Sequence, residues 1–226
     1  MLNSRLIFKQ ICTLCTSHEG GKLSLCPACL KDLPWYSTPQ CPQCATPTDG
    51  SICGRCLGSP PYFDTSHALF SYDYPLDRLL QHYKYQESLH LANTFATLLG
   101  NQIQPEHHLD VIIPMPMHQM RIKERGFNQA LEIAKLLARQ TKIALDYTST
   151  IRKKYTPPQA SLPLKDRISN MRGAFECHSN LQGLSIAIVD DVMTTGASLN
   201  ELAKTLKQAG ASHVECRVIA RTLAKY

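Results

Sequence analysis

Two adjacent carboxylates and a run of small hydroxyl residues follow an apolar stretch late in the chain. The apolar residues 186–189 lead into Asp190 and Asp191, and the segment that follows contributes Thr194, Thr195, Gly196, Ala197 and Ser198. Neighbouring carboxylates can accept hydrogen bonds from two vicinal sugar hydroxyls. A glycine turn that opens a helix presents backbone N–H groups and the positive end of the helix dipole to an anion. The pattern predicts a site for a phosphorylated sugar, whereas an ordinary helix cap after a strand needs only one acidic residue.

Eight of the ten cysteines form four Cys-x-x-Cys pairs near the start of the chain: Cys12 and Cys15, Cys26 and Cys29, Cys41 and Cys44, Cys53 and Cys56. Zinc takes four such ligands in a tetrahedron at about 2.3 Å from each sulfur, so eight thiolates predict about two structural zinc ions. Disulfides and an iron–sulfur cluster are the weaker alternatives. The simplest arrangement has the first two pairs bind one ion and the last two pairs bind the other, although a crossed arrangement stays open. Cys177 and Cys216 lie apart and are expected to be half-buried.

Positive charge is concentrated in one segment. Residues 118–172 hold twelve lysines and arginines against four acids, a net of +8, while the whole chain carries +6. Such a segment attracts the phosphates of a small ligand or of a nucleic acid, or it is simply a solvated surface. Residues 152–172 are polar, basic and contain proline, so we expect a loop there.

A scaffold must bring these distant segments together. After Pro60 and Pro61, apolar runs of strand length alternate with helical patterns, with strands expected at 68–72, 110–113, 184–189 and 214–220 and helices at 76–83, 91–100, 128–140 and 198–209. This alternation predicts an α/β fold, with a mainly parallel sheet, helices on both faces and ligands at the carboxyl ends of the strands. We expect a zinc-ribbon module over 1–61 and the α/β domain over 62–226.

The compartment can be inferred from apolar content and cysteine usage. No apolar run approaches the ~20 residues that span a bilayer, and residues 6–8 are too short for the core of a signal peptide. Dense cysteine pairs in a reducing compartment usually hold metal rather than form disulfides. We therefore expect a cytoplasmic protein without a membrane span.

Residues 186–198 resemble the diagnostic loop of the phosphoribosyltransferase family, in which apolar residues and two acids precede a threonine-rich glycine turn. The resemblance implies a type I phosphoribosyltransferase fold. It also implies that Asp190 and Asp191 hold the ribose of phosphoribosyl pyrophosphate, that residues 194–198 hold its 5′-phosphate, and that Mg²⁺ accompanies the ligand. The turn at Met115, Pro116 and Met117 is then expected to hold the pyrophosphate, with Arg121, Arg125 and a basic loop closing over it.

The resemblance covers nearly the whole chain. The Pro-x-Pro-x-His run at 114–118, the Arg-Gly-Phe-Asn-Gln run at 125–129, the Thr-Pro-Pro-Gln run ending at Gln159, Arg167 and the Gly-Ala-Phe run at 173–175 are similar in order and spacing to the ComF family of competence proteins. Lys84-Tyr85 fits as well, and family members begin with a similar zinc-ribbon module. The resemblance implies that Gln159 and Arg167 join the ligand site. It further implies a role in natural transformation, with single-stranded DNA uptake and a helicase-type partner, but identifies no catalytic residue.

Three functions stay open, because a fold does not decide function. The favoured one is a DNA-uptake factor that keeps the phosphoribosyl pyrophosphate site and binds a partner or single-stranded DNA, with Trp35, Tyr36, Tyr85 or Phe127 as stacking faces. The second is a phosphoribosyltransferase with an unknown acceptor in nucleotide metabolism. The third is a non-catalytic sensor of phosphoribosyl pyrophosphate. Trp35 has a competing structural role, which is to dock a ribbon on the sheet.

Overall fold

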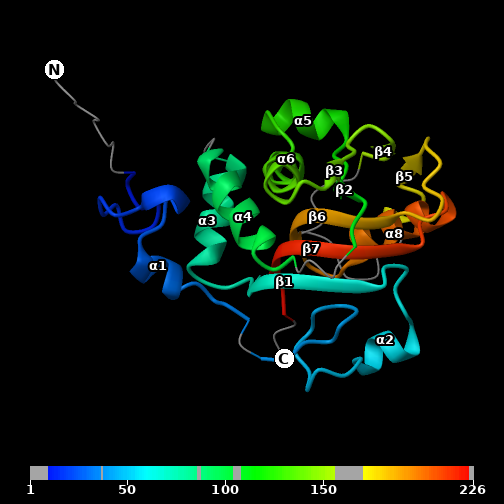
Figure 1. The fold of residues 1–226 in the computed structure, drawn as a ribbon, viewed down its shortest axis with the longest axis horizontal. Helices are drawn as coiled ribbons and strands as arrows, with labels where there is room; N and C mark the ends of the chain where they lie inside the picture. Colours follow the sequence, from blue (N-terminus) through cyan, green and yellow to red (C-terminus); the bar gives the residue numbers. More distant parts are fainter. Residues whose placement is uncertain (1–9, 37, 86–87, 104–107, 156–169, 224–226) are drawn as a thin grey trace.

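Five parallel strands form the central sheet. The computed structural model describes residues 10–36, 38–85, 88–103, 108–155 and 170–223 (Figure 1). Within them the strand order is β1-β7-β6-β2-β3. The strands are β1 (Thr65–Ser71), β2 (Val111–Pro114), β3 (Ala144–Leu145), β6 (Ser185–Met193) and β7 (His213–Arg221). The expected α/β class with a parallel sheet is therefore confirmed.

Helices cover both faces of this sheet. On one face lie α3 (Leu76–Tyr85), α4 (His90–Gly100) and α6 (Gln129–Thr141), and on the other lies α8 (Ala197–Gln208). Side chains alternate between the two cores, as the period of a strand requires. Along β6, Ala187 and Val189 face the first core, while Ile186 and Ile188 face the second. Burial on both faces explains why the strands appear as nearly continuous apolar runs in the sequence.

Four short elements of the described α/β part were not expected from the sequence. They are the edge strand β3, the helix α5 (Gln119–Arg125) and the antiparallel pair β4 (Thr150–Arg152) and β5 (Phe175–Cys177). Helix α5 buries no residue, so it leaves no apolar periodicity to detect. Its ends are set locally, because the His118 imidazole accepts a hydrogen bond from the Met120 N–H and Gly126 ends the helix at a φ of 87°.

Strand β6 is longer than predicted. The sequence pattern ended it at residue 189, but it runs to Met193 and includes both acids. Val192 and Met193 pair with Ala220 and Arg221, because β7 is long enough to continue the ladder. The acidic pair therefore lies on a hydrogen-bonded strand rather than in the turn after it.

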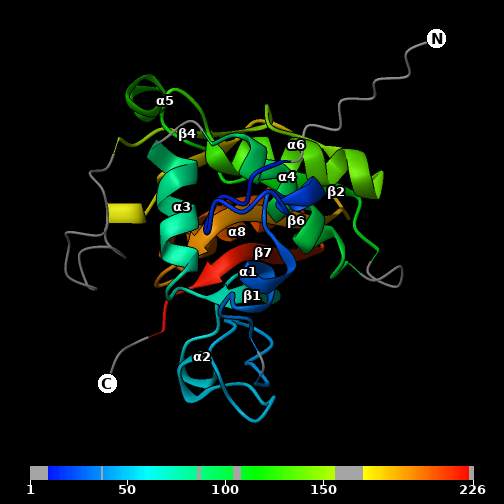
Figure 2. The same cartoon turned by 90° about the vertical axis from the view of Figure 1, so that its left-hand side faces the viewer.

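The two cysteine-rich ribbons pack on opposite cores. The first ribbon includes η1 (Gly21–Leu23) and α1 (Pro27–Lys31), and its Leu25 and Leu33 join the core beneath α4. The second includes α2 (Gly54–Gly58), and Cys41 and Cys44 join the core beneath α8. Figures 1 and 2 both show the first ribbon beside α4 and the second beyond β1. The boundary after residue 61 stays a prediction.

Trp35 joins the ribbon region to the sheet. Its ring lies 4.5 Å from that of Phe70 in β1, centroid to centroid, and its indole N–H donates to the Leu30 carbonyl. The docking role considered for this residue is confirmed. Among the helices of the described residues, none has the length and apolar character needed to cross a membrane.

Candidate functional site

The acidic pair lies in the second half of β6, which runs between β7 and β2 in the sheet. Asp190 is opposite Val218 of β7, and the residue before it, Val189, is opposite Pro114 at the end of β2. The Asp191 N–H donates to Asp190 Oδ1 at 2.9 Å, which fixes the first carboxylate. Both side chains are therefore at the carboxyl edge of a parallel sheet, where α/β folds bind ligands.

Two cations from distant elements meet this pair. Lys84, at the end of α3, places its Nζ 2.7 Å from Asp191 Oδ2. Burial lowers the pKa of Lys84, but Asp191 outweighs it and raises that pKa overall, so the ammonium stays charged. Arg152, the last residue of β4, is close enough to Asp190 for the two charges to interact.

The pKa of Asp190 is strongly perturbed. Burial, followed by the negative charge of Asp191, raises its pKa from 3.8 to about 7, although Lys84 and Arg152 act in the opposite direction. In the absence of ligand, Asp190 therefore keeps its proton to a much higher pH than an ordinary aspartate does. A strongly perturbed carboxyl at a ligand edge is typical of a functional site.

The glycine turn follows the strand directly. Gly196 precedes α8 with a left-handed φ of 80°, and Thr195 Oγ1 accepts a hydrogen bond from the Ala197 N–H at 3.2 Å. A Cβ on Gly196 would lie 2.9 Å from Met193 Cε, so a side chain there meets both backbone strain and a packed neighbour. The turn thus brings backbone N–H groups to the start of a twelve-residue helix, an arrangement suited to phosphate.

The turn after β2 begins beside the acidic strand. The Met115 N–H donates to the Val189 carbonyl at 2.8 Å, and Asn128 Nδ2 donates to the Met115 carbonyl at 3.0 Å. Met115 is buried, and Pro116 and Met117 are half-buried at the edge of a cavity of about 630 Å³. The structure thus brings the predicted pyrophosphate turn next to the predicted ribose ligands.

The two arginines of α5 that were predicted to bind pyrophosphate contact other protein side chains in the structure. Arg121 Nη1 lies 3.5 Å from Glu124 Oε2. Arg125 donates to Gln129 Oε1 at 2.9 Å and lies 5.3 Å from the ring centroid of Tyr85. Tyr85 directly follows Lys84, so Arg125 lies near the end of α3. Gln159 and Arg167 lie outside the described residues, and their roles stay predictions.

Lys84 was not among the predicted ligand residues, and Arg152 was expected only as part of the basic loop, with Lys153, Lys154 and Arg167, that closes over the pyrophosphate. Lys84 stands 106 positions before Asp190 in the sequence, and no local pattern connects the two. The signals of Lys84 in the sequence were its place at the end of a predicted helix and the fit of Lys84-Tyr85 to the family pattern. The order of the strands in the sheet brings distant segments to the site. The cation that pairs with an acid can therefore come from any element that ends at the carboxyl edge of the sheet.

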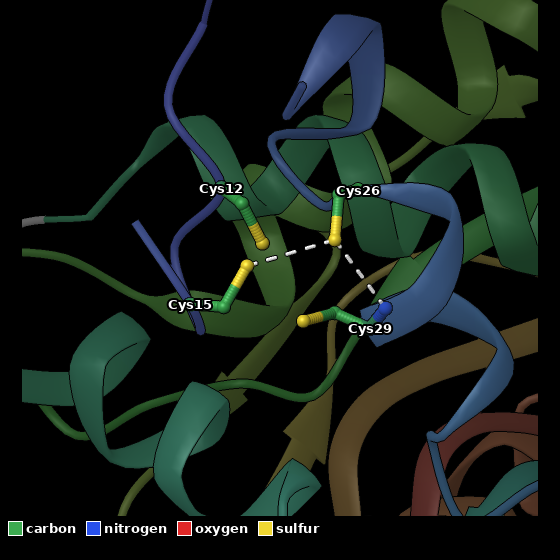
Figure 3. A group of neighbouring side chains, drawn as sticks. All are labelled: Cys12, Cys15, Cys26 and Cys29. Carbon is green, nitrogen blue, oxygen red and sulfur yellow. Dashed lines mark hydrogen bonds between the residues drawn. The ribbon is translucent and has the colours of Figure 1, made fainter. Parts of the chain in front are cut away.

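The eight N-terminal cysteines form two separate clusters of consecutive pairs. One contains Cys12, Cys15, Cys26 and Cys29 (Figure 3), and the other contains Cys41, Cys44, Cys53 and Cys56; within each cluster the sulfurs lie within 4.8 Å of one another. The sequential pairing is confirmed. All ten cysteines are free, and Cys216 is fully buried rather than half-buried, because β7 is covered on both faces.

Sulfur spacing matches a tetrahedral zinc site. The Sγ atoms of Cys15 and Cys26 lie 3.6 Å apart, as do those of Cys44 and Cys53. A tetrahedron with zinc–sulfur bonds of about 2.3 Å has edges of about 3.8 Å, whereas a disulfide needs about 2.05 Å. Backbone N–H groups also donate to sulfur, as from Cys53 to Cys41 Sγ at 3.4 Å. The clusters therefore fit two structural zinc ions.

The thiols also need a cation for electrostatic reasons. Burial would raise the pKa of Cys44, but hydrogen bonds outweigh it and lower that pKa to about 7. Burial and the neighbouring sulfurs raise the pKa of Cys29 in the first cluster and of Cys56 in the second. Four thiolates this close cannot all be ionised at neutral pH without a bound cation, which zinc supplies.

These features define a zinc-ribbon protein with a phosphoribosyltransferase fold. The family model of the double zinc ribbon domain matches residues 4–57, and that of the phosphoribosyl transferase domain matches residues 127–226. A purine phosphoribosyltransferase from Pyrococcus horikoshii aligns with 57% of this chain and 80% of its own, at 21% identity and a TM-score of 0.38, a weak similarity.

Relatives match along nearly the whole chain. Competence protein F of Haemophilus influenzae is 32% identical over 89% of this chain and 92% of its own length. DNA utilization protein YhgH of Escherichia coli K12 is 31% identical over 94% of this chain and 97% of its own. Competence protein ComFC of Bacillus subtilis is 25% identical over 90% and 91%. The chain belongs to the ComF/YhgH family.

Proposed function

We propose that this protein binds phosphoribosyl pyrophosphate and acts in the uptake or use of DNA. One observation carries the ligand assignment: Asp190 and Asp191 stand on one strand between the turn that follows β2 and the glycine turn that opens α8. A phosphorylated sugar with a second anionic group fits that order of polar groups. The names of the relatives, which refer to competence and DNA utilization, support the DNA role.

The proposed pose follows from the three segments. The 5′-phosphate lies on the backbone and hydroxyls of residues 194–198, at the positive end of α8. The ribose hydroxyls donate to Asp190 and Asp191, and the pyrophosphate lies toward the turn at 115–117. Lys84 and Arg152 then face the leaving group as well as the acids, and charge-assisted hydrogen bonds to phosphate are the strong ones.

The residues of the site are compatible with a magnesium ion that is held mainly by the bound ligand. Carboxylate oxygens are ligands that Mg²⁺ accepts, but the ion usually keeps waters and substrate phosphates as most of its shell. Lys84 already pairs with Asp191, so the ion would be held mainly by oxygens of the pyrophosphate and ribose. When bound, Mg²⁺ would neutralise charge on the pyrophosphate.

A second candidate function is transfer of the ribosyl group to an acceptor. The cavity of about 630 Å³ beside the pyrophosphate turn supports it, since Tyr147, Ile151 and Met120 give that cavity an apolar wall that a planar base could contact. Transfer would need phosphoribosyl pyrophosphate and the acceptor to bind together. A sensor, in contrast, would bind phosphoribosyl pyrophosphate and release no pyrophosphate from it.

One experiment separates these functions. Purified full-length protein with zinc in place is mixed with phosphoribosyl pyrophosphate and Mg²⁺, and both binding and pyrophosphate release are followed, with and without single-stranded DNA or free nucleobases. Binding without release, accompanied by DNA binding, is the expected result. Release that depends on a nucleobase would favour the transferase. Absence of ligand binding would contradict the ligand assignment for all three functions.

A further inference from the structure

The second ribbon contacts the glycine turn directly. The buried Arg221, at the end of β7, donates from Nε to the Cys44 carbonyl at 3.0 Å. Its Nη1 donates to the Met193 carbonyl at 3.0 Å and to the Thr194 carbonyl. From α2, Arg55 Nη2 donates to the Thr195 carbonyl at 3.2 Å. Two guanidinium groups thus bind three consecutive carbonyls at the start of the turn.

These carbonyls matter because of how a backbone binds an anion. When successive N–H groups of a turn face a phosphate, their carbonyls have to point elsewhere and find donors there. A buried carbonyl without a donor costs free energy and favours a different turn. Arg221 and Arg55 supply those donors to the Thr194 and Thr195 carbonyls on the side of the turn that faces the second ribbon, whereas the Met193 carbonyl also accepts from the Thr222 N–H at 3.0 Å.

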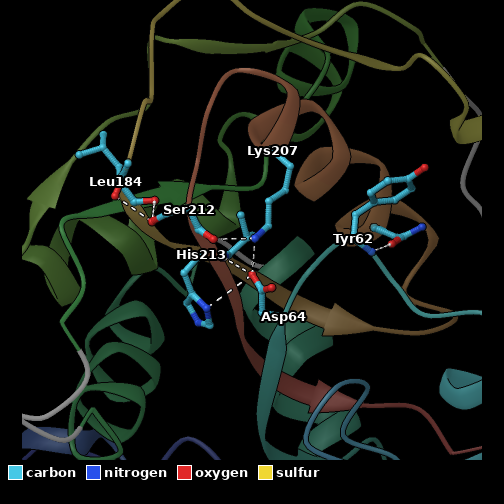
Figure 4. A network of polar contacts seen from close by, with 9 residues as sticks. Tyr62, Asp64, Leu184, Lys207, Ser212 and His213 are labelled. Carbon is cyan, nitrogen blue, oxygen red and sulfur yellow. Dashed lines mark hydrogen bonds and ion pairs between the residues drawn. The ribbon is translucent and has the colours of Figure 1, made fainter.

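The same side of the turn is packed by the chain that leaves the second ribbon. Phe63 lies within 4.0 Å of where a Cβ on Gly196 would be. The Tyr62 N–H donates to Asn200 Oδ1 of α8 at 2.6 Å. Asp64, shown in Figure 4 between Lys207 and His213, pairs with Lys207 at 2.7 Å. The second ribbon is thereby held against α8 from its exit to β1.

The contact between Arg221 and the second cluster should depend on zinc because of its electrostatics. Four thiolates around Zn²⁺ carry a net charge of about −2, and Arg221 binds the backbone of one ligand residue, Cys44. Between the second cluster and the turn lies a cavity of about 190 Å³, lined by Cys44, Cys56, Phe63 and Met193 among others. The turn therefore has space to relax if its arginine anchors are lost.

The first ribbon provides an internal comparison. Its contacts run to α4, where Thr94 Oγ1 donates to the Leu23 carbonyl and Asn93 Nδ2 donates to the Lys22 carbonyl at 3.2 Å. It packs on the opposite core of the sheet from α8. The two clusters have the same four-cysteine ligand set, but the first ribbon contacts α4 whereas the second contacts the glycine turn and α8.

We propose that Arg221 is a positioning residue that couples the second zinc cluster to the phosphate-binding turn, so that the second cluster sets ligand affinity far more than the first does. The inference rests on the proposed function for its ligand and on the contacts of Arg221 for its mechanism.

The test compares Arg221→Met with wild type in three measurements: the Kd for phosphoribosyl pyrophosphate with Mg²⁺, zinc content, and hydrogen exchange of the amides of residues 194–198 without ligand. We expect Kd to rise about tenfold or more, exchange to become faster, and about two zinc ions to remain. Arg221→Lys keeps the charge and some donors, so its Kd and its exchange rates should lie between those of wild type and Arg221→Met. Unchanged Kd and unchanged exchange in folded Arg221→Met would overturn the proposal.

Single-ligand variants of the two clusters complete the design. Cys53→Ser should raise Kd and speed exchange in the turn more than Cys15→Ser does, and equal effects of the two variants would argue against the coupling. If wild type does not bind phosphoribosyl pyrophosphate, the proposed function fails. Exchange in the turn still tests Arg221 in that case, because it needs no ligand.

Discussion

Replacing Asp190 with asparagine should change how the stability of the unliganded protein depends on pH. Asparagine keeps the Oδ1 that accepts the Asp191 N–H but cannot ionise. The pKa of Asp190 is 3.8 in a model peptide and about 7 in the fold. The folded protein thus binds this proton more tightly than the unfolded chain does. Wild type therefore loses stability as pH rises from about 4 to about 7, and the variant lacks that loss.

The size of the effect follows from the pKa. Each pKa unit corresponds to about 1.4 kcal/mol, so the interval from pH 5.5 to a folded pKa of about 7 gives a ceiling of ~2 kcal/mol. Because Asp190 is only half-buried, solvent screening reduces this, and we expect ~1 kcal/mol. The variant's stability relative to wild type should increase by that amount between pH 5.5 and 8.

Urea denaturation of both proteins at pH 5.5, 6.5 and 8, with zinc present, measures this difference. Comparison at equal pH cancels the pH dependence of zinc binding. Asp146→Asn is a matched control: burial raises the pKa of Asp146, but hydrogen bonds from Ser149 and Thr148 outweigh it and lower that pKa. The stabilisation by Asp146 is thus complete above pH 5.5, and its variant should show a constant difference. A constant difference for Asp190→Asn as well would refute the assigned electrostatics of the acidic pair.

Three further predictions concern metal, charge and DNA. Metal analysis of purified protein should find about two zinc ions per chain; about one would mean that a cluster is not a site. Lys84→Met removes a cation that lowers the pKa of Asp190, so the pH at which ligand affinity is half lost should rise by about half a unit or more; an unchanged midpoint would exclude this role. Single-stranded DNA should bind with a Kd of micromolar order that weakens with salt, and changing Arg152, Lys153 and Lys154 to Gln should lower the salt slope by about 2. No detectable binding at low salt would leave contact through a partner protein.

The sheet and the main helices could be predicted from sequence because their signals are local. Strands β1, β2, β6 and β7 are apolar runs and α6 has a clear periodicity with a cap at Asn128, so their existence follows from a short window, whereas the two-residue β3 is too short to give such a signal. Elements without a buried face, such as α5, carry no such signal. Pairing beyond residue 189 depends on the length of β7, which lies about 25 residues further along the chain.

The candidate site was predictable only in part, for a related reason. The acids, the glycine turn and the cysteine clusters are each contiguous motifs whose chemistry can be inferred from residue types. Lys84 and Arg221 reach the site through strand order and the packing of a ribbon against α8. Such contacts depend on the whole topology, and only the structure brings them together with Asp191 and the turn.

Calorimetric titration with phosphoribosyl pyrophosphate and Mg²⁺ tests the central claim most directly. Three proteins are compared: wild type, the double variant Asp190→Asn with Asp191→Asn, and Asp110→Asn. Asp110 lies at the opposite end of the strands, where it accepts the Ser185 N–H, and makes a matched control. Wild type and Asp110→Asn should bind alike, whereas the folded double variant should bind about 100-fold more weakly, a loss of ~2.7 kcal/mol. Equal affinity in the double variant, or no binding by wild type, would contradict the account.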